Sequence, residues 1–287
     1  MNSTILKSEE IKCSVYQKVI KIHTNDAVYI TKEALSAQQS EILADEFRIL
    51  EYLSGTYMEN NIPKVLRSEK TNAFYEEYIN GKTLTDILCQ NTFSAELCDE
   101  LISVIKKLHS VDKSPMLTLK TECVSWKEYI LNTLATYEEK ITRSSLDSIL
   151  FKKVFEFEHS ILGSLPNISD ETVILHNDLN TSNIIVNDDG NMYLIDFERW
   201  TVGDPLKEIS KLIWWFRKDK KSGDYILFNL FERELKQYEY DLLKAYFLLD
   251  ILFHFSLYDT LSNDPVWMKY YIEEFNIISN TEEIELW

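Results

Sequence analysis

The chain has 287 residues, 45% of them hydrophobic and 13% aromatic, which is enough apolar material for a packed core and excludes a disordered chain. Its 47 acidic and 30 basic residues give a net charge of −17, which disfavours nucleic acid and anionic membrane surfaces as partners and favours cationic small molecules. The six glycines never lie within five positions of one another. This spacing excludes the Walker phosphate loop and the dinucleotide-binding fingerprint.

The cysteines predict a reduced protein, because Cys13, Cys89, Cys98 and Cys123 show no CxxC spacing for a zinc site or a redox motif. The first residues lack a basic stretch followed by an apolar run, so no signal peptide is expected. No apolar segment is long enough to cross a bilayer. We therefore expect a cytoplasmic monomer or dimer.

The first eighty residues predict strands around one helix. Residues 15–23 and 27–32 are rich in β-branched and aromatic side chains, and the turn residues Thr24, Asn25 and Asp26 between them predict a hairpin. Residues 35–54 have helical periodicity, and residues 72–79 return to strand character. This region predicts a small α+β lobe over residues 1–80.

After Gly81 the chain is mostly helical. Thr83 and Asp86 form a capping-box pattern, and Leu97, Leu101, Ile105 and Leu108 make one apolar helix face. Further helices are predicted over 124–138, 145–162, 204–218 and 224–258. A β island from Val173 to Phe197 interrupts them. The fold class is therefore α+β, with a larger, mostly helical lobe over 81–287 that carries a β-hairpin insert.

The β island contains the sharpest chemical pattern, His176-Asn-Asp178-Leu-Asn-Thr-Ser-Asn183 followed by Asp196-Phe-Glu. A two-residue turn at Asp189-Gly190 predicts a hairpin in which opposing residue numbers sum to 379, so that Asn183 faces Asp196. Two converging oxygen ligands suit Mg²⁺. Asp178 lies close enough in sequence to orient or accept the proton of an attacking hydroxyl at this site.

The predicted helix over 35–54 carries a second pattern. Glu46 lies in an apolar column with Ile42, Ile49 and Leu53. A carboxylate on an apolar face needs a partner, because burial of an unpaired charge is costly. Lys32, at the end of the preceding strand, is the expected partner.

These motifs resemble the aminoglycoside (antibiotic) phosphotransferase and choline kinase family, which has a bilobal protein-kinase-like fold. HNDLNTSN with LIDFE is similar to the catalytic and metal loops of that family. Further similar segments are the Glu46 helix, the segment at Ile62-Pro63, the hinge that ends at Gly81, and Gly203-Asp204-Pro205 at a helix start. The similarity extends over residues 15 to about 216.

The resemblance implies a magnesium-dependent kinase with ATP or GTP as phosphate donor, whose residues 1–80 form a nucleotide-binding lobe. It implies that Asp178 is the catalytic residue and that His176 braces the catalytic loop. Asn183 and Asp196 would bind Mg²⁺, and Lys32, held by Glu46, would contact the phosphates. The backbones of Glu77 and Ile79 would hydrogen-bond the base. The nucleotide loop is expected around Glu9–Ser14, where Ser14 replaces the usual glycines as a contact.

The acceptor is expected to be a cationic, hydroxyl-bearing small molecule, and an aminoglycoside-type antibiotic is the first candidate. Residues 224–287 hold 13 acidic and four basic residues, and Glu198, Asp204, Asp250 and Asp259 are candidate substrate contacts. A choline or ethanolamine kinase is the alternative, because HNDL and IDFE are closer to choline kinases. A catalytically inactive kinase fold that only binds ligands is the non-enzymatic alternative.

Overall fold

The computed structural model describes residues 4–14, 16–90, 93–117, 125–144, 151–163, 172–257 and 265–279. The chain divides into two compact units. Unit 1 comprises residues 1–112 and 176–201, and unit 2 comprises residues 113–175 and 202–287. Most of the β island, from His176 to Phe197, thus belongs to the compact unit that also holds the N-terminal strands, whereas Val173–Leu175 belong to unit 2. The predicted lobe boundary at residue 80 remains a prediction.

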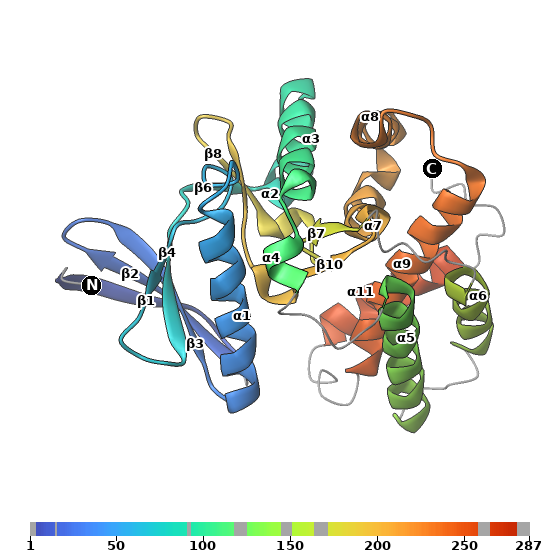
Figure 1. Cartoon of the computed structure of the whole chain (residues 1–287), viewed down its shortest axis with the longest axis horizontal. Coiled ribbons are helices and arrows are strands. Elements are labelled where there is room, and N and C mark those ends of the chain that lie inside the picture. The colour runs from blue at the N-terminus through green and yellow to red at the C-terminus, as the bar shows by residue number, and fades with distance from the viewer. Residues whose placement is uncertain are drawn as a thin grey trace. The chain divides into compact units, whose positions relative to one another are not determined.

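Unit 1 contains a five-stranded antiparallel sheet with strand order β1-β2-β3-β5-β4. Helix α1 lies along one face of this sheet (Figure 1). The bounds of these elements are β1 Ile5–Cys13, β2 Gln17–Thr24, β3 Val28–Ala34, α1 Ala37–Leu53, β4 Val65–Arg67 and β5 Ala73–Glu77. The predicted hairpin is confirmed, since the N–H of Thr24 donates to the Ala27 carbonyl at 2.9 Å across the turn.

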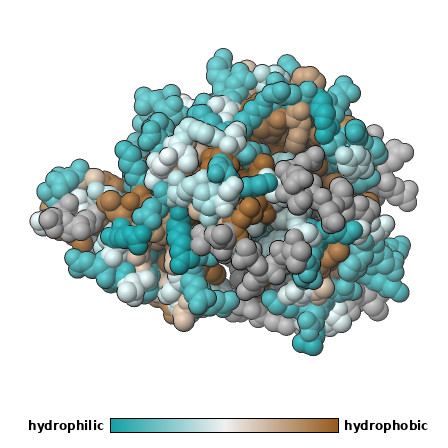
Figure 2. Space-filling view, in the orientation of Figure 1, coloured by the Kyte–Doolittle hydropathy of each residue, from teal (hydrophilic) through white to brown (hydrophobic). Residues whose placement is uncertain are grey.

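Strand β1 was not predicted, because all of its residues are exposed and its sequence shows no regular apolar alternation. Ile5, Leu6 and Ile11 of this strand are exposed, and Figure 2 shows hydrophobic surface near the N-terminal strands. Glu9 to Cys13 therefore form strand rather than the expected loop. Of that expected loop only Ser14 lies in the turn between β1 and β2.

A smaller three-stranded sheet in unit 1 has the order β6-β8-β9. Its strands are β6 Gly81–Thr83, β8 Ile184–Asn187 and β9 Met192–Leu194, and the helices α2 Leu84–Cys89 and α3 Ala95–Ser110 follow β6. Gly81 permits the β6–β8 approach, because a Cβ atom there would lie 2.2 Å from the Val186 carbonyl oxygen. The capping box of Thr83 and Asp86 is confirmed at the start of α2.

The predicted register of the β8–β9 hairpin is wrong by one residue. Ile184 pairs with Leu194 and Val186 with Met192, so opposing residue numbers sum to 378. The loop has three residues rather than two, because the Asn187 Oδ1 accepts two loop N–H groups and Gly190 adopts a positive φ of 85°. Asn183 consequently lies opposite Ile195, whose N–H donates to the Asn183 carbonyl at 3.0 Å.

The described part of unit 2 is helical except for a two-stranded sheet of β7 and β10. Its core is α9, a 20-residue helix of which 13 residues are buried, and α5, α6, α7 and α11 pack against it. The elements are α4 Ser114–Leu117, α5 Trp126–Arg143, α6 Lys152–Gly163, β7 Val173–Leu175, β10 Thr201–Gly203, α7 Pro205–Trp215, α8 Lys220–Phe231, α9 Gln237–Ser256 and α11 Pro265–Ser279. None of the described helices is long and apolar enough to span a membrane.

The single helix predicted over 224–258 is wrong, because α8 and α9 are separate helices. Glu232 ends α8 with a positive φ of 55°, and the Glu239 carboxylate accepts the Lys236 N–H at 2.8 Å at the start of α9. The continuous apolar pattern of this region did not reveal the break, which depends on local capping rather than on periodicity.

Candidate active site

The predicted Lys32–Glu46 pair is confirmed. Lys32 lies on β3 and Glu46 on α1, and the Lys32 Nζ is 2.6 Å from Glu46 Oε1. Both residues are buried, with exposed fractions of 5% and 0%. The apolar column on α1 therefore placed Glu46 correctly, and the end of β3 brings the lysine to it.

Lys32 also contacts two further carboxylates. Its Nζ is 3.0 Å from Asp196 Oδ1 and 3.8 Å from Glu76 Oε1. Burial works to lower the pKa of Lys32, but Asp196, Glu46 and Glu76 outweigh burial and raise this pKa well above its usual value. Lys32 is therefore held as an ammonium group at the centre of an acidic cluster. Glu76 was missed in the sequence, where the only signal was a charged residue inside an aromatic strand.

Asp196 lies just after β9, and its backbone is in the left-handed region with φ 69°. Burial works to raise the pKa of Asp196, but the contact with Lys32 prevails and lowers it, which keeps this carboxylate ionised. Asn177 also has a positive φ, of 61°, and its side chain donates to the Arg199 carbonyl at 2.9 Å. Strained non-glycine backbone of this kind concentrates at functional sites.

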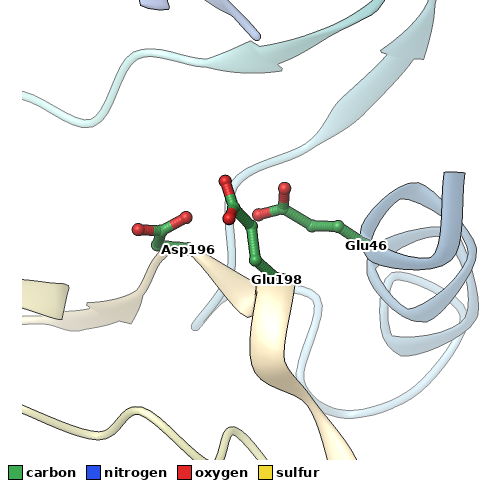
Figure 3. A group of neighbouring side chains, drawn as sticks. All are labelled: Glu46, Asp196 and Glu198. Carbon is green, nitrogen blue, oxygen red and sulfur yellow. The ribbon is translucent and has the colours of Figure 1, made fainter. Parts of the chain in front are cut away.

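Glu198 points from the same loop toward α1. Figure 3 shows its carboxylate between those of Asp196 and Glu46, and oxygens of all three lie within 4.8 Å of one another. Gln39 Nε2 lies 3.5 Å from Glu198 Oε2. Burial and then Asp196 raise the pKa of Glu198. Gln39 was not predicted from the sequence as part of this site.

Asp178 lies in a loop that side-chain amides hold in place. The Asn183 Nδ2 donates to the Asp178 carbonyl at 2.9 Å and to its Oδ2 at 3.2 Å, and Asn180 Nδ2 lies 3.4 Å from Oδ1. Arg199, which was not predicted from the sequence, places its Nη1 3.9 Å from Asp178 Oδ1. Asp178 keeps a partly exposed side chain, with 22% of its surface accessible.

His176 is fully buried beneath this loop. Its Nε2 lies 2.7 Å from the Ile195 carbonyl, and its Nδ1 accepts the N–H of Asp178 at 3.3 Å. Burial lowers the pKa of His176, which favours the neutral imidazole that such a bridge requires. The imidazole thus joins the Asp178 loop to the strand end that carries Asp196.

The shift in hairpin register changes how the two predicted metal ligands come together. They are not a directly opposed pair, but Asp178 contacts Asn183 and also acts electrostatically on Asp196. The Asn183 amide nitrogen faces Asp178, which leaves Oδ1 as an acceptor for a cation. A carboxylate and an amide oxygen form a donor set that fits Mg²⁺.

A cavity of about 270 Å³ opens beside Lys32. Val19 and Ile30 of the large sheet line it together with Ile185 and Ile195. The edge of the cavity is formed by consecutive residues from Glu76 to Ile79, and Asp196 also borders it. Apolar walls with polar groups at one edge suit a flat heteroaromatic ring.

The other predicted nucleotide contacts lie in this unit as well. The N–H of Glu77 donates to the Lys64 carbonyl, whereas the N–H of Ile79 has no hydrogen-bond partner among the described residues. The Ser14 hydroxyl accepts the N–H groups of Tyr16 and Gln17 at 3.1 Å. Ser14 thus closes the β1–β2 turn that a glycine-rich loop would otherwise form.

Two of the candidate substrate residues lie in the core of unit 2. Asp204 caps α7 through the Leu206 N–H at 2.9 Å and accepts the Tyr246 hydroxyl at 2.8 Å. Asp250 pairs with Lys207 through both oxygens at 2.9 Å. Asp259 lies outside the described residues. Contact of these residues with substrate remains a prediction.

The fold and this arrangement define a protein-kinase-like phosphotransferase. The sequence profile of the phosphotransferase enzyme family, APH, matches residues 15–240, and the chain belongs to this family. No match is found among curated protein sequences.

Solved structures share the fold at low sequence identity. The apo form of a thermostable mutant of the aminoglycoside phosphotransferase APH(4)-Ia is 16% identical, with a TM-score of 0.73 over 97% of this chain and 96% of that chain. A macrolide 2′-phosphotransferase type I is 11% identical, with a TM-score of 0.72 over 94% and 91%. The APH(2″)-IIa complex with streptomycin and ATP is 18% identical, with a TM-score of 0.67 over 87% and 86%.

Proposed function

We propose that this protein is a small-molecule kinase that transfers the γ-phosphoryl group of ATP or GTP to a hydroxyl of a cationic substrate. An aminoglycoside-type antibiotic is the first candidate substrate, which would make the protein a resistance enzyme. The observation that carries the proposal is that one compact unit brings together the Lys32–Glu46 pair, Asp196, Asp178 and a cavity that suits a purine.

The donor nucleotide occupies the cavity in this proposal. Val19 and Ile30 cover one face of the base and Ile185 and Ile195 the other, while the backbones of Glu77 and Ile79 hydrogen-bond its edge. Lys32 also lines the cavity and contacts the phosphates as an ammonium group. Glu46 holds Lys32 in position at 2.6 Å.

The transfer step uses the loop beneath this cavity. The acceptor hydroxyl oxygen attacks the γ-phosphorus, the bond to the β–γ bridging oxygen breaks, and the nucleoside diphosphate leaves. Asp178 orients the hydroxyl and takes its proton. Asn183 and Asp196 hold Mg²⁺, which neutralises the phosphate charge when it is bound. His176 braces the loop through its contacts with Asp178 and Ile195.

A cationic acceptor is supported by charge and by the known relatives. Residues 224–287 carry a net charge of −9, and an acidic surface concentrates cations and speeds their association. A ternary complex of an APH(4)-Ia variant contains ADP and hygromycin B, and another relative is described as a macrolide phosphotransferase. The second candidate, a choline or ethanolamine kinase, is favoured by the HNDL and IDFE motifs.

The test is a coupled kinase assay with ATP and with GTP on aminoglycosides, a macrolide, choline and ethanolamine. The proposal predicts Mg²⁺-dependent release of nucleoside diphosphate with one of the cationic antibiotics, and a product that is heavier by one phosphoryl group. Turnover of choline alone would favour the metabolic kinase. Nucleotide binding without turnover of any acceptor would favour the inactive binding fold.

A further inference from the structure

Glu76 on β5 presents a buried carboxylate with one oxygen unused. The residue is 6% exposed and lines the cavity. Its Oε1 lies 3.8 Å from the Lys32 Nζ, whereas its Oε2 is buried and has no hydrogen-bond partner within the described part of the chain. A buried acceptor without a donor is costly, so a group that enters the cavity and donates a hydrogen bond would relieve this cost.

The backbone beside Glu76 fixes which ligand edge could reach this oxygen. Glu76, Glu77, Tyr78 and Ile79 follow one another along the cavity edge. The N–H groups of Glu77 and Tyr78 already donate to Lys64 and Val28, so Ile79 supplies the remaining backbone N–H. The edge therefore offers a donor at Ile79 and a carboxylate acceptor at Glu76.

We propose that Glu76 is a specificity-determining residue that accepts a hydrogen bond from the exocyclic amino group of the purine base. This inference rests on the proposed nucleotide site. Adenine carries such an amino group at C6 and guanine carries one at C2, whereas hypoxanthine carries none. The site therefore selects amino-substituted purine nucleotides, and Ile79 binds an acceptor atom on the same base edge.

Two pairs of triphosphates isolate the amino group. GTP and ITP differ only by the 2-amino group, and ATP and purine riboside triphosphate differ only by the 6-amino group. In the pair that contains the better donor nucleotide, we expect kcat/KM to favour the amino-bearing member by roughly ten- to a hundredfold. Glu76→Met should reduce this ratio to about one, because the methionine side chain fills the space but accepts no such hydrogen bond.

The ratio of kcat/KM for the two nucleotides of a pair, measured within one variant, separates recognition of the base by Glu76 from the contact of Glu76 with Lys32. If Glu76→Met disturbs Lys32, both members of a pair lose activity equally and the ratio reports only the amino group. Glu33→Met is the matched control, since Glu33 lies on the opposite face of the neighbouring strand and pairs with Lys70 at 2.9 Å. This control should keep the wild-type ratio.

Binding of the same nucleotides, measured by displacement of a fluorescent nucleotide, gives a readout that does not need turnover. Glu76→Gln keeps an acceptor oxygen and should retain part of the discrimination if the methionine variant does not fold. Equal use of both members by the wild type, or an unchanged ratio in Glu76→Met, would overturn the inference and leave the kinase proposal intact. Absence of binding by all four nucleotides would overturn both.

Discussion

The two units each bury a lysine beside a carboxylate, and the two pairs differ in what surrounds them. Lys32 with Glu46 in unit 1 and Lys207 with Asp250 in unit 2 are all at most 5% exposed. Lys207 reaches both oxygens of Asp250 at 2.9 Å, so this pair is geometrically matched. Lys32 is shared among three carboxylates and borders a cavity.

The surplus of acceptors around Lys32 borders a cavity, whereas Glu158, whose two oxygens also lack hydrogen-bond partners among the described residues, interacts electrostatically with Lys207 inside the core of unit 2. Glu46 Oε2, Glu76 Oε2 and Glu198 Oε1 are buried without hydrogen-bond partners within the described residues. Buried polar groups in a core are normally satisfied, and exceptions call for a ligand or a functional explanation. We therefore expect changes near Lys32 to affect activity more than stability, and changes near Lys207 to do the reverse.

The largest expected effect is the loss of phosphoryl transfer in Asp178→Ala. A group that positions or takes a proton contributes about 10²–10⁴-fold, so kcat should fall by that factor while nucleotide binding is kept. Asp178 is partly exposed, so the melting temperature should change little. Steady-state kinetics and thermal unfolding measure the two effects. Retention of more than a tenth of wild-type turnover would contradict the assigned role.

Asp250→Ala should have the opposite profile. It leaves the Lys207 ammonium buried without its bidentate partner, which typically costs about 3–5 kcal/mol of unfolding free energy. Denaturant unfolding measures this cost, and kcat per folded molecule should be unchanged.

The double variant Lys207→Met with Asp250→Leu serves as control, because an apolar replacement of a buried pair is often neutral. Stable folding of Asp250→Ala together with a raised KM for the acceptor would instead identify Asp250 as a substrate contact.

Lys32→Met tests the other side of the comparison. Removal of an ammonium that contacts the donor phosphates should lower kcat/KM for the nucleotide by roughly 10²–10³-fold. The stability loss should be smaller than for Asp250→Ala, because burial already raises the pKa values of Glu46 and Glu76, so these carboxylates can take up protons once the ammonium group is gone. Equal destabilisation by both variants, with activity intact, would remove the distinction between the two pairs.

The sequence was sufficient for features that depend on local patterns. The apolar column on α1 placed Glu46 next to Lys32, the turn residues after β2 placed a hairpin, and Thr83 placed a capping box. The motif residues His176, Asp178, Asn183 and Asp196 fall in the same unit as predicted for a shared site.

Features set by particular side-chain contacts, by single backbone conformations or by the packing of distant elements were not accessible from the sequence. The hairpin register depends on the Asn187 side chain, which accepts two loop N–H groups. The break between α8 and α9 depends on one left-handed residue, Glu232. The positions of Glu76 and Glu198 relative to Lys32 arise only when β5, α1 and the loop after β9 pack together.

His109 on α3 gives a pH-dependent stability in unit 1 that is separate from catalysis. Burial lowers its pKa from 6.5 to about 4, and its Nε2 has no hydrogen-bond partner in the described structure. Between these pH values the His109 imidazole is protonated in the unfolded chain but not in the folded protein. Its contribution to the unfolding free energy is therefore complete above pH 6.5 and is lost as the pH falls toward 4.

The residue is not fully enclosed, so we expect a difference of about 1–3 kcal/mol between pH 7 and pH 4. Denaturant unfolding of the wild type and of His109→Phe over this pH range gives the contribution of His109 as the difference between their unfolding free energies. Buried carboxyls such as Glu198 stabilise the protein as the pH falls, and this opposite effect cancels in the difference. Parallel pH profiles of the two proteins would show that His109 contributes nothing to acid sensitivity.

The smallest expected effect concerns the acidic surface rather than either buried pair. Residues 224–287 have a net charge of −9, in which Asp250 and Glu274 are buried and paired with Lys207 and Arg217. The remaining acidic residues attract a cationic acceptor, and this attraction is screened with a Debye length of about 8 Å at physiological ionic strength. Raising the salt concentration should therefore lower kcat/KM for the acceptor by up to roughly tenfold, mainly through KM.

A neutral acceptor assayed at the same salt concentrations is the control, because its encounter with the enzyme has no charge to screen. If the best acceptor is neutral or anionic, or if its KM ignores ionic strength, the electrostatic account of substrate choice fails. The assignment of Asp178 and Lys32 would stand in that case, because it rests on the geometry of unit 1 and not on the charge of the C-terminal region.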